Sequence, residues 1–210
     1  TPSIHSTTTE SGGVWSISDF DDTLISSTTP MVIWLDGDAD DATTMMVGYV
    51  GNSVSSIPLY YNYVISHTVG SNDALGITDF DFYDSSSDAD ILYTIGISTT
   101  TIASNILINK GTFVAPTTTM DVQGDFENNS TFDANSGKVV MSGTDKNIDG
   151  VLTGSSAFYQ LTIAGSSTIV TSSASTTDLI IDIGSSSPPP LTSPSPVISP
   201  TTVHTTPTVV

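Results

Sequence analysis

Two stretches of sequence, GTFVAPTTTMDVQGD at 111–125 and STFDANSGKVVMSGT at 130–144, decide the fold because they align with a shift of 19 positions. The shift matches Phe113 with Phe132, Ala115 with Ala134, Met120 with Val139, Val122 with Met141 and Gly124 with Gly143. A repeat of about 20 residues has the length of one coil of a β-solenoid, in which each coil stacks on the next. We therefore predict an all-β protein, a parallel β-helix with inward columns of apolar side chains.

A longer repeat is predicted around the aromatic stretch AFYQLTIAGSS at 157–167. The stretch LYYNYVISHTV at 59–69 aligns with it and sets Tyr61, Tyr63 and Ile65 against Tyr159, Leu161 and Ile163. Both stretches alternate large apolar residues with polar or β-branched ones. This alternation has a period of two residues, as expected for a β-strand. We predict one building unit used twice, over 14–70 and 112–167, with an Asp-rich insertion in the first copy.

The remaining chain also reads as short strands separated by turns. Alternating or apolar runs predict strands at 14–20 (VWSISDF), 77–84 (ITDFDFYD), 91–97 (ILYTIGI) and 105–110 (NILINK). Helical spacing of apolar residues is nearly absent, and Thr, Ser, Val, Ile and Asp dominate. Turn signals at roughly ten-residue spacing would also suit a β-sandwich, which is the alternative fold. The 19-residue shift favours the solenoid.

Three segments are expected along the chain. Residues 1–13 are a polar N-terminal segment, residues 14–184 form the β-solenoid domain, and residues 185–210 are a tail rich in Pro, Ser and Thr. The tail holds 7 of the 11 prolines and no acidic or basic residue apart from His204, so it lacks the content for a core of its own. Because the sequence opens on Thr1, we expect that a signal peptide has been removed or that the chain is a fragment.

The charge balance limits the partners of the protein. The 210 residues include 3 lysines, no arginine and 22 acidic residues, giving a net charge of -19, and there is no cysteine. Such a surface repels nucleic acid and anionic membranes, and no apolar run is long enough to insert into a bilayer. Only 12% of the residues are charged while Ser and Thr abound, which indicates a secreted or cell-surface protein.

The run from 117 to 167 resembles the repeats of large secreted, β-helix-forming surface proteins of bacteria. In those repeats a GxFxNNGTFxAxxGxVxFxG coil is followed by an FYNLTI strand. The matching residues are Gly124, Phe126, Asn128, Asn129, Thr131, Phe132, Ala134, Gly137, Val139, Gly143, Phe158, Tyr159, Leu161, Thr162 and Ile163. Ser130 and Gln160 depart from the pattern, and residues 31–68 match it more weakly. The resemblance implies a parallel β-helix with an adhesive or structural role at the cell surface and no catalytic residues.

Two acidic clusters are candidates for chemistry. The loop DGDADD places Asp36, Asp38, Asp40 and Asp41 at a spacing that lets carboxylates converge on calcium, although it departs from an EF-hand loop. The second cluster comprises Asp79, Asp81, Asp84, Asp88 and Asp90. For both, a solvated acidic turn is the competing interpretation.

Catalysis is not expected from this sequence. The acidic residues fall in turns rich in Gly, Ser and Asp, which are expected to be solvated. Acid–base catalysis by two carboxyl groups instead needs burial that separates their pKa values. His5, His67 and His204 are far apart, and no nucleophile elbow or phosphate-binding loop is present. Six aromatic residues could form a platform for surface glycans, although most are expected in the core: Trp15, Trp34, Tyr60, Tyr61, Tyr63 and Tyr159.

The sequence predicts a non-catalytic extracellular structural or adhesive module, a subunit or repeat of a cell-surface filament or adhesin. We expect it to bind copies of itself through apolar positions of the tail: Val197, Ile198, Val203, Val209 and Val210. Overlapping sequons make Asn128 and Asn129 candidate glycosylation sites, of which one at most would be used. The alternative from another class is a β-helix that binds or cleaves carbohydrate.

Overall fold

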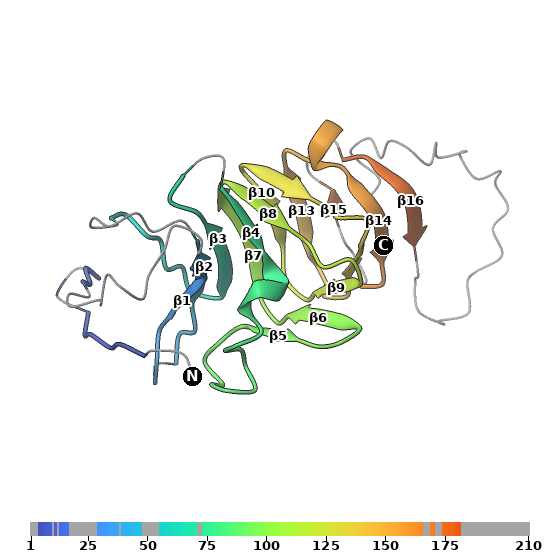
Figure 1. Ribbon diagram of the computed structural model, residues 1–210. Coiled ribbons are helices and arrows are strands. Elements are labelled where there is room, and N and C mark those ends of the chain that lie inside the picture. Colours follow the sequence, from blue (N-terminus) through green and yellow to red (C-terminus); the bar gives the residue numbers. More distant parts are fainter. Residues whose placement is uncertain are drawn as a thin grey trace, which may run out of the picture.

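The computed structural model describes residues 4–9, 11, 13–16, 29–37, 39–47, 55–70, 73–165, 169–170 and 174–181. These residues form a parallel β-solenoid of about six turns, which confirms the predicted fold class. The coils follow one another along a single axis, with β1 near one end and β16 at the other (Figure 1). The tail at 185–210, including all five of its predicted assembly residues, lies outside the described residues.

Three sheets run along the solenoid. The seven-stranded sheet contains, in spatial order, β1 (Met31–Trp34), β2 (Thr43–Met46), β3 (Tyr63–His67), β7 (Asn105–Lys110), β10 (Phe126–Asn128), β13 (Asn147–Gly150) and β15 (Ile169–Val170). The three-stranded sheet contains β11 (Thr131–Asp133), β8 (Thr112–Val114) and β4 (Ala74–Gly76). The six-stranded sheet contains β16 (Thr176–Ile181), β14 (Phe158–Ile163), β12 (Lys138–Met141), β9 (Thr119–Val122), β6 (Thr99–Ile102) and β5 (Tyr93–Ile95). Two short 3-10 helices, η1 (Ile77–Phe80) and η2 (Gly154–Ser156), lie between strands.

The register between coils confirms the 19-residue repeat. β8 and β11 pair in parallel with Phe113 beside Phe132, and β9 and β12 pair in parallel with Met120 beside Val139. Strands β7, β8 and β9 therefore form one coil, and β10, β11 and β12 form the next. A slip of one residue would turn every inward side chain outward, so the apolar pattern specifies this register.

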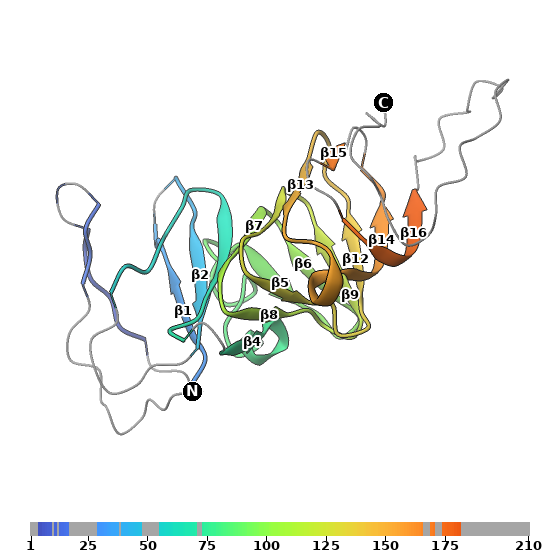
Figure 2. The same ribbon diagram turned by 90° about the horizontal axis from the view of Figure 1, so that it is seen from above.

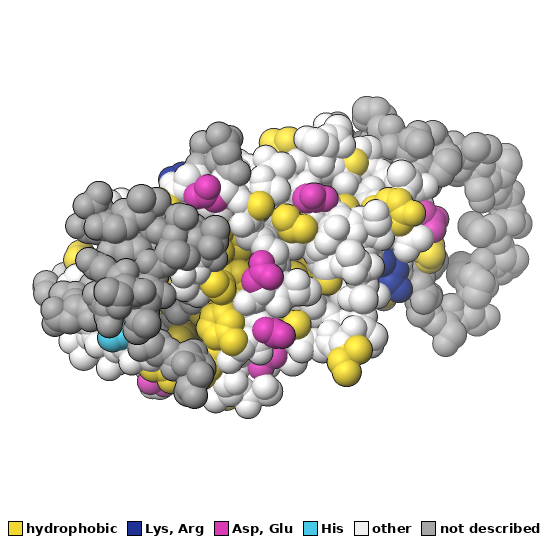
Figure 3. All heavy atoms as spheres, in the orientation of Figure 1, with side chains coloured by type: hydrophobic (Ala, Val, Ile, Leu, Met, Phe, Trp, Pro, Cys, Tyr) yellow, Lys and Arg dark blue, Asp and Glu magenta, His cyan; other side chains and the backbone are white. Residues whose placement is uncertain are grey.

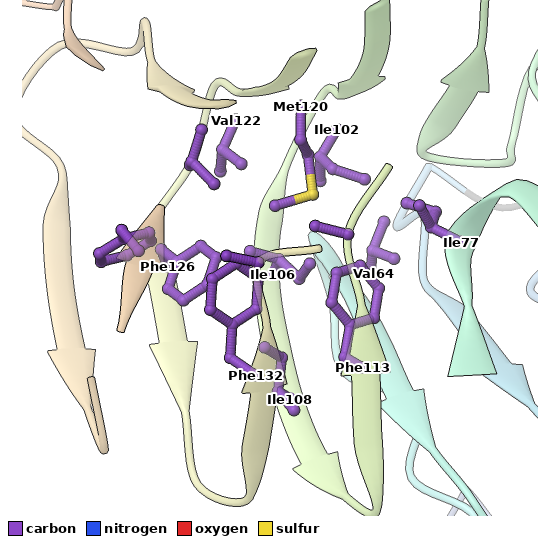
Figure 4. Close-up of a cluster of buried hydrophobic side chains, with 14 of the residues drawn as sticks. Val64, Ile77, Ile102, Ile106, Ile108, Phe113, Met120, Val122, Phe126 and Phe132 are labelled. Carbon is purple, nitrogen blue, oxygen red and sulfur yellow. The ribbon is translucent and has the colours of Figure 1, made fainter. Parts of the chain in front are cut away.

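Aromatic side chains fill the centre of the core. The rings of Phe126, Phe132 and Phe158 lie with centroids 5.2 to 5.4 Å apart, and Phe113 stacks on Phe132 at 6.4 Å. In Figure 4 Phe113, Phe126 and Phe132 extend from neighbouring strands into one cluster with Ile106 and other aliphatic side chains. Burying each such side chain contributes about 1.5 to 3 kcal/mol. Packing of these side chains between coils therefore stabilises the solenoid.

The corners of the coils need unusual backbone or very small side chains. Asn135 and Ser136 have φ angles of 47° and 59°, which lie in the left-handed region that Asn tolerates better than most residues. Gly143 stands at another corner, where a Cβ would lie 2.0 Å from the carbonyl oxygen of Gln123 in the preceding coil. A side chain there would push the coils apart. The glycine of the 19-residue repeat is thus required by close approach of the backbone.

The two ends of the described solenoid differ. Near the N-terminal end β1 pairs with β2, and β5 pairs with β6, in the antiparallel sense. All other pairs among the described strands are parallel, and at the C-terminal end β16 pairs in parallel with β14 (Figure 2). The parallel winding therefore ends at β1 in the seven-stranded sheet and at β5 in the six-stranded sheet. Among the described strands, none pairs with the outer edge of β16.

The predicted repeat over a hundred residues is not a structural repeat. Its two aromatic strands occupy different sheets, because β3 belongs to the seven-stranded sheet and β14 to the six-stranded sheet. Short strands flanked by Gly and Asp turns share an alternating pattern whichever sheet they enter. The similarity between the two stretches therefore reflects a common strand pattern rather than an equivalent position in the coil.

Two further sequence predictions need correction. The segment 77–84 is not a strand, because Ile77–Phe80 forms η1 and buries Ile77 and Phe80 three positions apart. Most of the six aromatic residues were expected to be buried or half-buried, but only Trp15, Trp34 and Tyr63 are half-buried, and Tyr60, Tyr61 and Tyr159 are exposed. The part of the chain that is described contains no helix long and apolar enough to cross a membrane.

Candidate functional site

A shallow hollow of about 340 Å³ lies on the seven-stranded sheet. It is lined by Tyr63, Asp125, Phe126, Glu127, Asn147 and Asp149. Parallel register creates this grouping, since Glu127 of β10 lies directly beside Asp149 of β13. Carboxylates from successive coils thus become neighbours on one surface.

Backbone contacts at a corner of the coil position one of these carboxylates. The Asn105 Oδ1 atom accepts a hydrogen bond from the Asp125 amide at 2.8 Å, and Asp125 Oδ1 accepts one from the Asn147 amide at 2.8 Å. Each of these two side chains thus accepts a hydrogen bond from a backbone amide of the following coil. Asp125 therefore has a structural role in addition to lining the hollow.

The aromatic wall of the hollow lies in an acidic environment. Burial of Tyr63, followed by the negative charges of Glu127 and Asp125, raises the pKa of its hydroxyl above the ordinary value. The ring of Tyr60 meets that of Tyr63 edge to face, with centroids 6.3 Å apart, and Tyr60 is 51% exposed. An exposed aromatic surface beside carboxylates and an amide can hold a sugar ring or a cationic group.

A second site joins the two acidic clusters of the sequence. Asp36, Asp88 and Asp90 each place a carboxylate oxygen so that the three oxygens lie within 4.8 Å of one another. The Gly37 amide donates to Asp90 Oδ2 at 2.6 Å, which ties the N-terminal loop to the later one. The structure thus merges part of each predicted cluster, a contact that the sequence did not reveal.

The other members of the predicted clusters are placed differently. Asp38 lies outside the described residues, and Asp40 and Asp41 are not part of the three-carboxylate group. Asp79 and Asp81 are exposed near η1. On the face seen in Figure 3, acidic side chains are spread over the surface rather than gathered in a single patch. Three carboxylates could supply part of the six to eight oxygens that calcium takes, and calcium binding stays a prediction.

Asp84 organises the loop that carries Asp88 and Asp90. Asp84 Oδ1 accepts hydrogen bonds from the amide and the hydroxyl of Ser86 at 2.9 and 2.6 Å, and Oδ2 accepts one from the Ile95 amide at 2.9 Å. The Asp84 carbonyl also accepts the Asp88 amide at 3.1 Å. Burial acts to raise the pKa of Asp84, but the hydrogen bonds from Ser86 and Ile95 outweigh it and lower this pKa.

The two candidate glycosylation sites are not equivalent. Asn128 is fully buried in β10, and its side-chain amide donates to the Val151 carbonyl oxygen. Asn129 is exposed, and its amide donates to Glu127 Oε1 at 2.6 Å. Only Asn129 could carry a glycan without opening the fold.

Comparisons with known proteins return no relative. Neither a scan against protein-family models, nor a search of curated proteins, nor a search of solved structures finds a match.

Proposed function

We propose that the chain is a non-catalytic extracellular module with a structural or adhesive role, as part of a cell-surface filament or adhesin. The observation that carries this proposal is the continuous core, in which Phe113, Phe126, Phe132 and Phe158 interlock successive coils. Such stacking gives a rigid body whose outward side chains keep a fixed spacing along the axis. Solenoids use surfaces of this kind for extended contacts.

The composition supports the location outside the cell. The chain has 3 lysines, no arginine and a net charge of -19, with a large share of Ser and Thr. This surface suits a solvated extracellular environment and disfavours nucleic acid and anionic membranes as partners. Labelling of intact source cells with an impermeant reagent tests the location. Labelling that requires lysed cells would contradict it.

The environment of the carboxylates supports a non-catalytic role. Asp125 accepts a backbone hydrogen bond of the next coil, Glu127 accepts from Asn129, and Asp149 is exposed at an open hollow. Acid–base hydrolysis of a glycoside needs one carboxylic acid that burial keeps protonated. The hollow offers no such enclosed position.

Measurements on the purified chain test the structural role against an enzymatic one. We expect beads coated with the chain to adhere to cell-surface polysaccharide or to one another, and soluble polysaccharides to remain uncleaved during long incubation. If the role is structural, beads coated with the Glu127→Gln or the Asp149→Asn variant should adhere to one another as well as beads coated with the parent chain. Polysaccharide cleavage that either substitution abolishes would replace this proposal with an enzymatic function.

A second candidate function is glycan binding at the hollow. The specific observation in its favour is the pair of Tyr60 and Tyr63 beside Asp125, Glu127 and Asn147. An aromatic face packs against the apolar side of a sugar ring, while carboxylates and amides bond its hydroxyl groups. This arrangement would make the module adhesive toward glycans rather than only structural.

Binding to an array of glycans tests the second candidate. Tyr63→Ala should abolish binding if the hollow is the site, whereas Tyr159→Ala, which alters an exposed tyrosine of another sheet, should not affect it. Equal loss with both variants would place the site elsewhere. Self-association through the tail stays a prediction, because the assembly residues lie outside the described part of the chain.

A further inference from the structure

We propose that the hollow on the seven-stranded sheet binds glycans that carry free amino groups, such as polymers of de-N-acetylated hexosamine. The inference rests on the glycan binding proposed for this hollow and adds the charge of the ligand. Three of the six lining residues are carboxylates, Asp125, Glu127 and Asp149, and none of the six is a lysine or an arginine. The lining of the hollow is therefore complementary to a cation.

The hollow is the open part of the outer face of its sheet. Ile65 on β3 and Leu107 on β7 stand side by side and are flanked by core residues, so they point outward. Their side chains are nevertheless only 0% and 6% exposed. The same row continues with Glu127 on β10, which is half-buried, and Asp149 on β13, which is exposed. The cover over the outer face thus ends between β7 and β10, where the carboxylates begin.

The segment 55–62 supplies the aromatic wall of the hollow. Its Pro58 carbonyl oxygen accepts a hydrogen bond from the hydroxyl of Thr44, which lies on the same outer face of the sheet. The ring of Tyr60 meets that of Tyr63 edge to face at 6.3 Å, and Tyr60 is 51% exposed. The covering segment therefore ends in an exposed aromatic ring beside the acidic hollow.

The carboxylates of the hollow repel one another. Glu127 and Asp149 stand side by side on parallel strands, which lie about 4.8 Å apart, and like charges so placed destabilise a sheet. The hydrogen bonds that Asp125 accepts from the Asn147 amide and that Glu127 accepts from Asn129 come from neutral donors. A cationic group bound among the three carboxylates would offset their repulsion.

The spacing of these carboxylates suits an organic cation better than a metal ion. Among the described residues, the one group whose carboxylate oxygens lie within 4.8 Å of one another is formed by Asp36, Asp88 and Asp90. The three carboxylates of the hollow do not converge in this way, so they cannot enclose a single ion together. Their oxygens can instead accept hydrogen bonds from an ammonium group and from several hydroxyl groups of one sugar.

An amino sugar matches more of the lining than a basic peptide does. The exposed ring of Tyr60 can pack against the apolar side of a sugar ring, and a nearby ammonium group is attracted to the same aromatic face. The carboxamide of Asn147 offers a donor and an acceptor to hydroxyl groups. A lysine side chain supplies the cation but has neither a ring face nor hydroxyl groups. A sugar with a free amine is therefore the favoured ligand.

Calorimetric titration with two oligosaccharides of equal length tests the proposal. The tetramer of glucosamine carries an amine on every ring, whereas the tetramer of N-acetylglucosamine carries neutral amides. At about pH 6, where carboxylates and amines are both ionised, we expect the glucosamine tetramer to bind at least about tenfold more tightly, and added salt to weaken it. Equal affinity for the two tetramers would overturn the preference for an amine and leave glycan binding standing. No binding of either tetramer would overturn both.

Single substitutions place the amine at the hollow. Glu127→Gln and Asp149→Asn should each weaken binding of the glucosamine tetramer about tenfold and leave binding of the acetylated tetramer unchanged. Asp178→Asn is the matched control, because it removes one charge at an exposed position of the six-stranded sheet. Equal losses in all three variants would show an effect of net charge alone and overturn the site. Tetralysine that binds as tightly as the glucosamine tetramer would overturn the sugar as the ligand.

Discussion

The regular coils at 105–163 pack differently from the coil at 63–102, which is the first coil with strands in all three sheets. In the regular part, Ile106, Phe126 and Ile148 stand side by side in three successive coils of nearly equal length. In the first coil, the chain from Val64 to its neighbour Ile106 is about twice as long as the chain from Ile106 to Phe126. The extra length is mostly an excursion at 77–95 that contains η1, the Asp84 loop and β5.

Different interactions therefore stabilise the regular coils and the excursion. Stacked apolar columns hold the regular coils, and their contribution scales with the area buried. A nearly buried carboxylate holds the excursion, because Asp84 accepts three hydrogen bonds from the loop that surrounds it. The excursion should therefore depend on the ionised state of Asp84, and its stability should fall as the pH drops and this carboxylate is protonated.

Leu161→Asp should have the largest effect and should break the regular part. Leu161 is 1% exposed and stands between Val139 and Leu179 in the inward column. An unpaired carboxylate there costs several kcal/mol, so we expect the domain to unfold. Thr162→Asp, one residue further along β14 and half-buried, is the control. Circular dichroism measures the outcome. A soluble Leu161→Asp protein with the spectrum of the folded parent would contradict the placement of the Leu161 side chain in the core.

Asp84→Ala should have an intermediate effect that is confined to the excursion. The substitution leaves the amides of Ser86 and Ile95 without their acceptor, at a cost of about 1 to 3 kcal/mol. Asp81→Ala, at an exposed position nearby, is the matched control. Urea unfolding should show a lower midpoint for Asp84→Ala and no change for Asp81→Ala, and the reverse order would contradict this account.

A smaller, pH-dependent effect is expected at His67, where the first coil meets β7. Burial, and then the positive charge of Lys110, lower the pKa of His67, and Asn109 Nδ2 lies 2.9 Å from His67 Nδ1. Since the unfolded imidazole takes up a proton near pH 6.5 and the folded one at lower pH, stability is lost as the pH falls below about 6.5. Thermal melts at pH 7.5 and 5.5 should differ less in His67→Gln than in the parent protein. Equal differences would exclude His67 as the cause.

Calcium should have the smallest effect on the melting temperature, and it would act on the excursion alone. An ion at Asp36, Asp88 and Asp90 would stabilise the excursion and leave the regular coils unchanged. Melting with calcium and with a chelator, for the parent protein and for Asp90→Asn, measures this contribution. Calorimetric titration that detects no heat, together with an unchanged melting temperature, would reject a structural ion.

The sequence predicted the regular part of the fold well because its coils have nearly constant length. The alignment of 111–125 with 130–144 predicted the register of Phe113 with Phe132 that the structure shows. Within the excursion, residues 77–84 were mispredicted because ITDFDFYD alternates like a strand, while Ile77 and Phe80 are buried together on a short 3-10 helix. The signal that could have revealed it was the spacing of these two apolar residues, followed by a run of Asp and Ser.

The candidate sites were less predictable because they depend on which coils become neighbours. Glu127 and Asp149 belong to different coils, and their contact requires the lengths of both coils and the strand register. Likewise Asp36 meets Asp90 only because the excursion folds back toward the N-terminal loop. A pattern within one segment carries no information about either contact.

Hydrogen exchange on the parent protein and on Asp84→Ala tests the central claim that two kinds of interaction hold the two regions. The account predicts that the substitution accelerates exchange at the amides of residues 84–96, and that the amides of residues 112–141 keep their protection. Equal acceleration in both regions would show that the solenoid opens as one cooperative unit, and it would contradict the separation of the excursion from the regular coils.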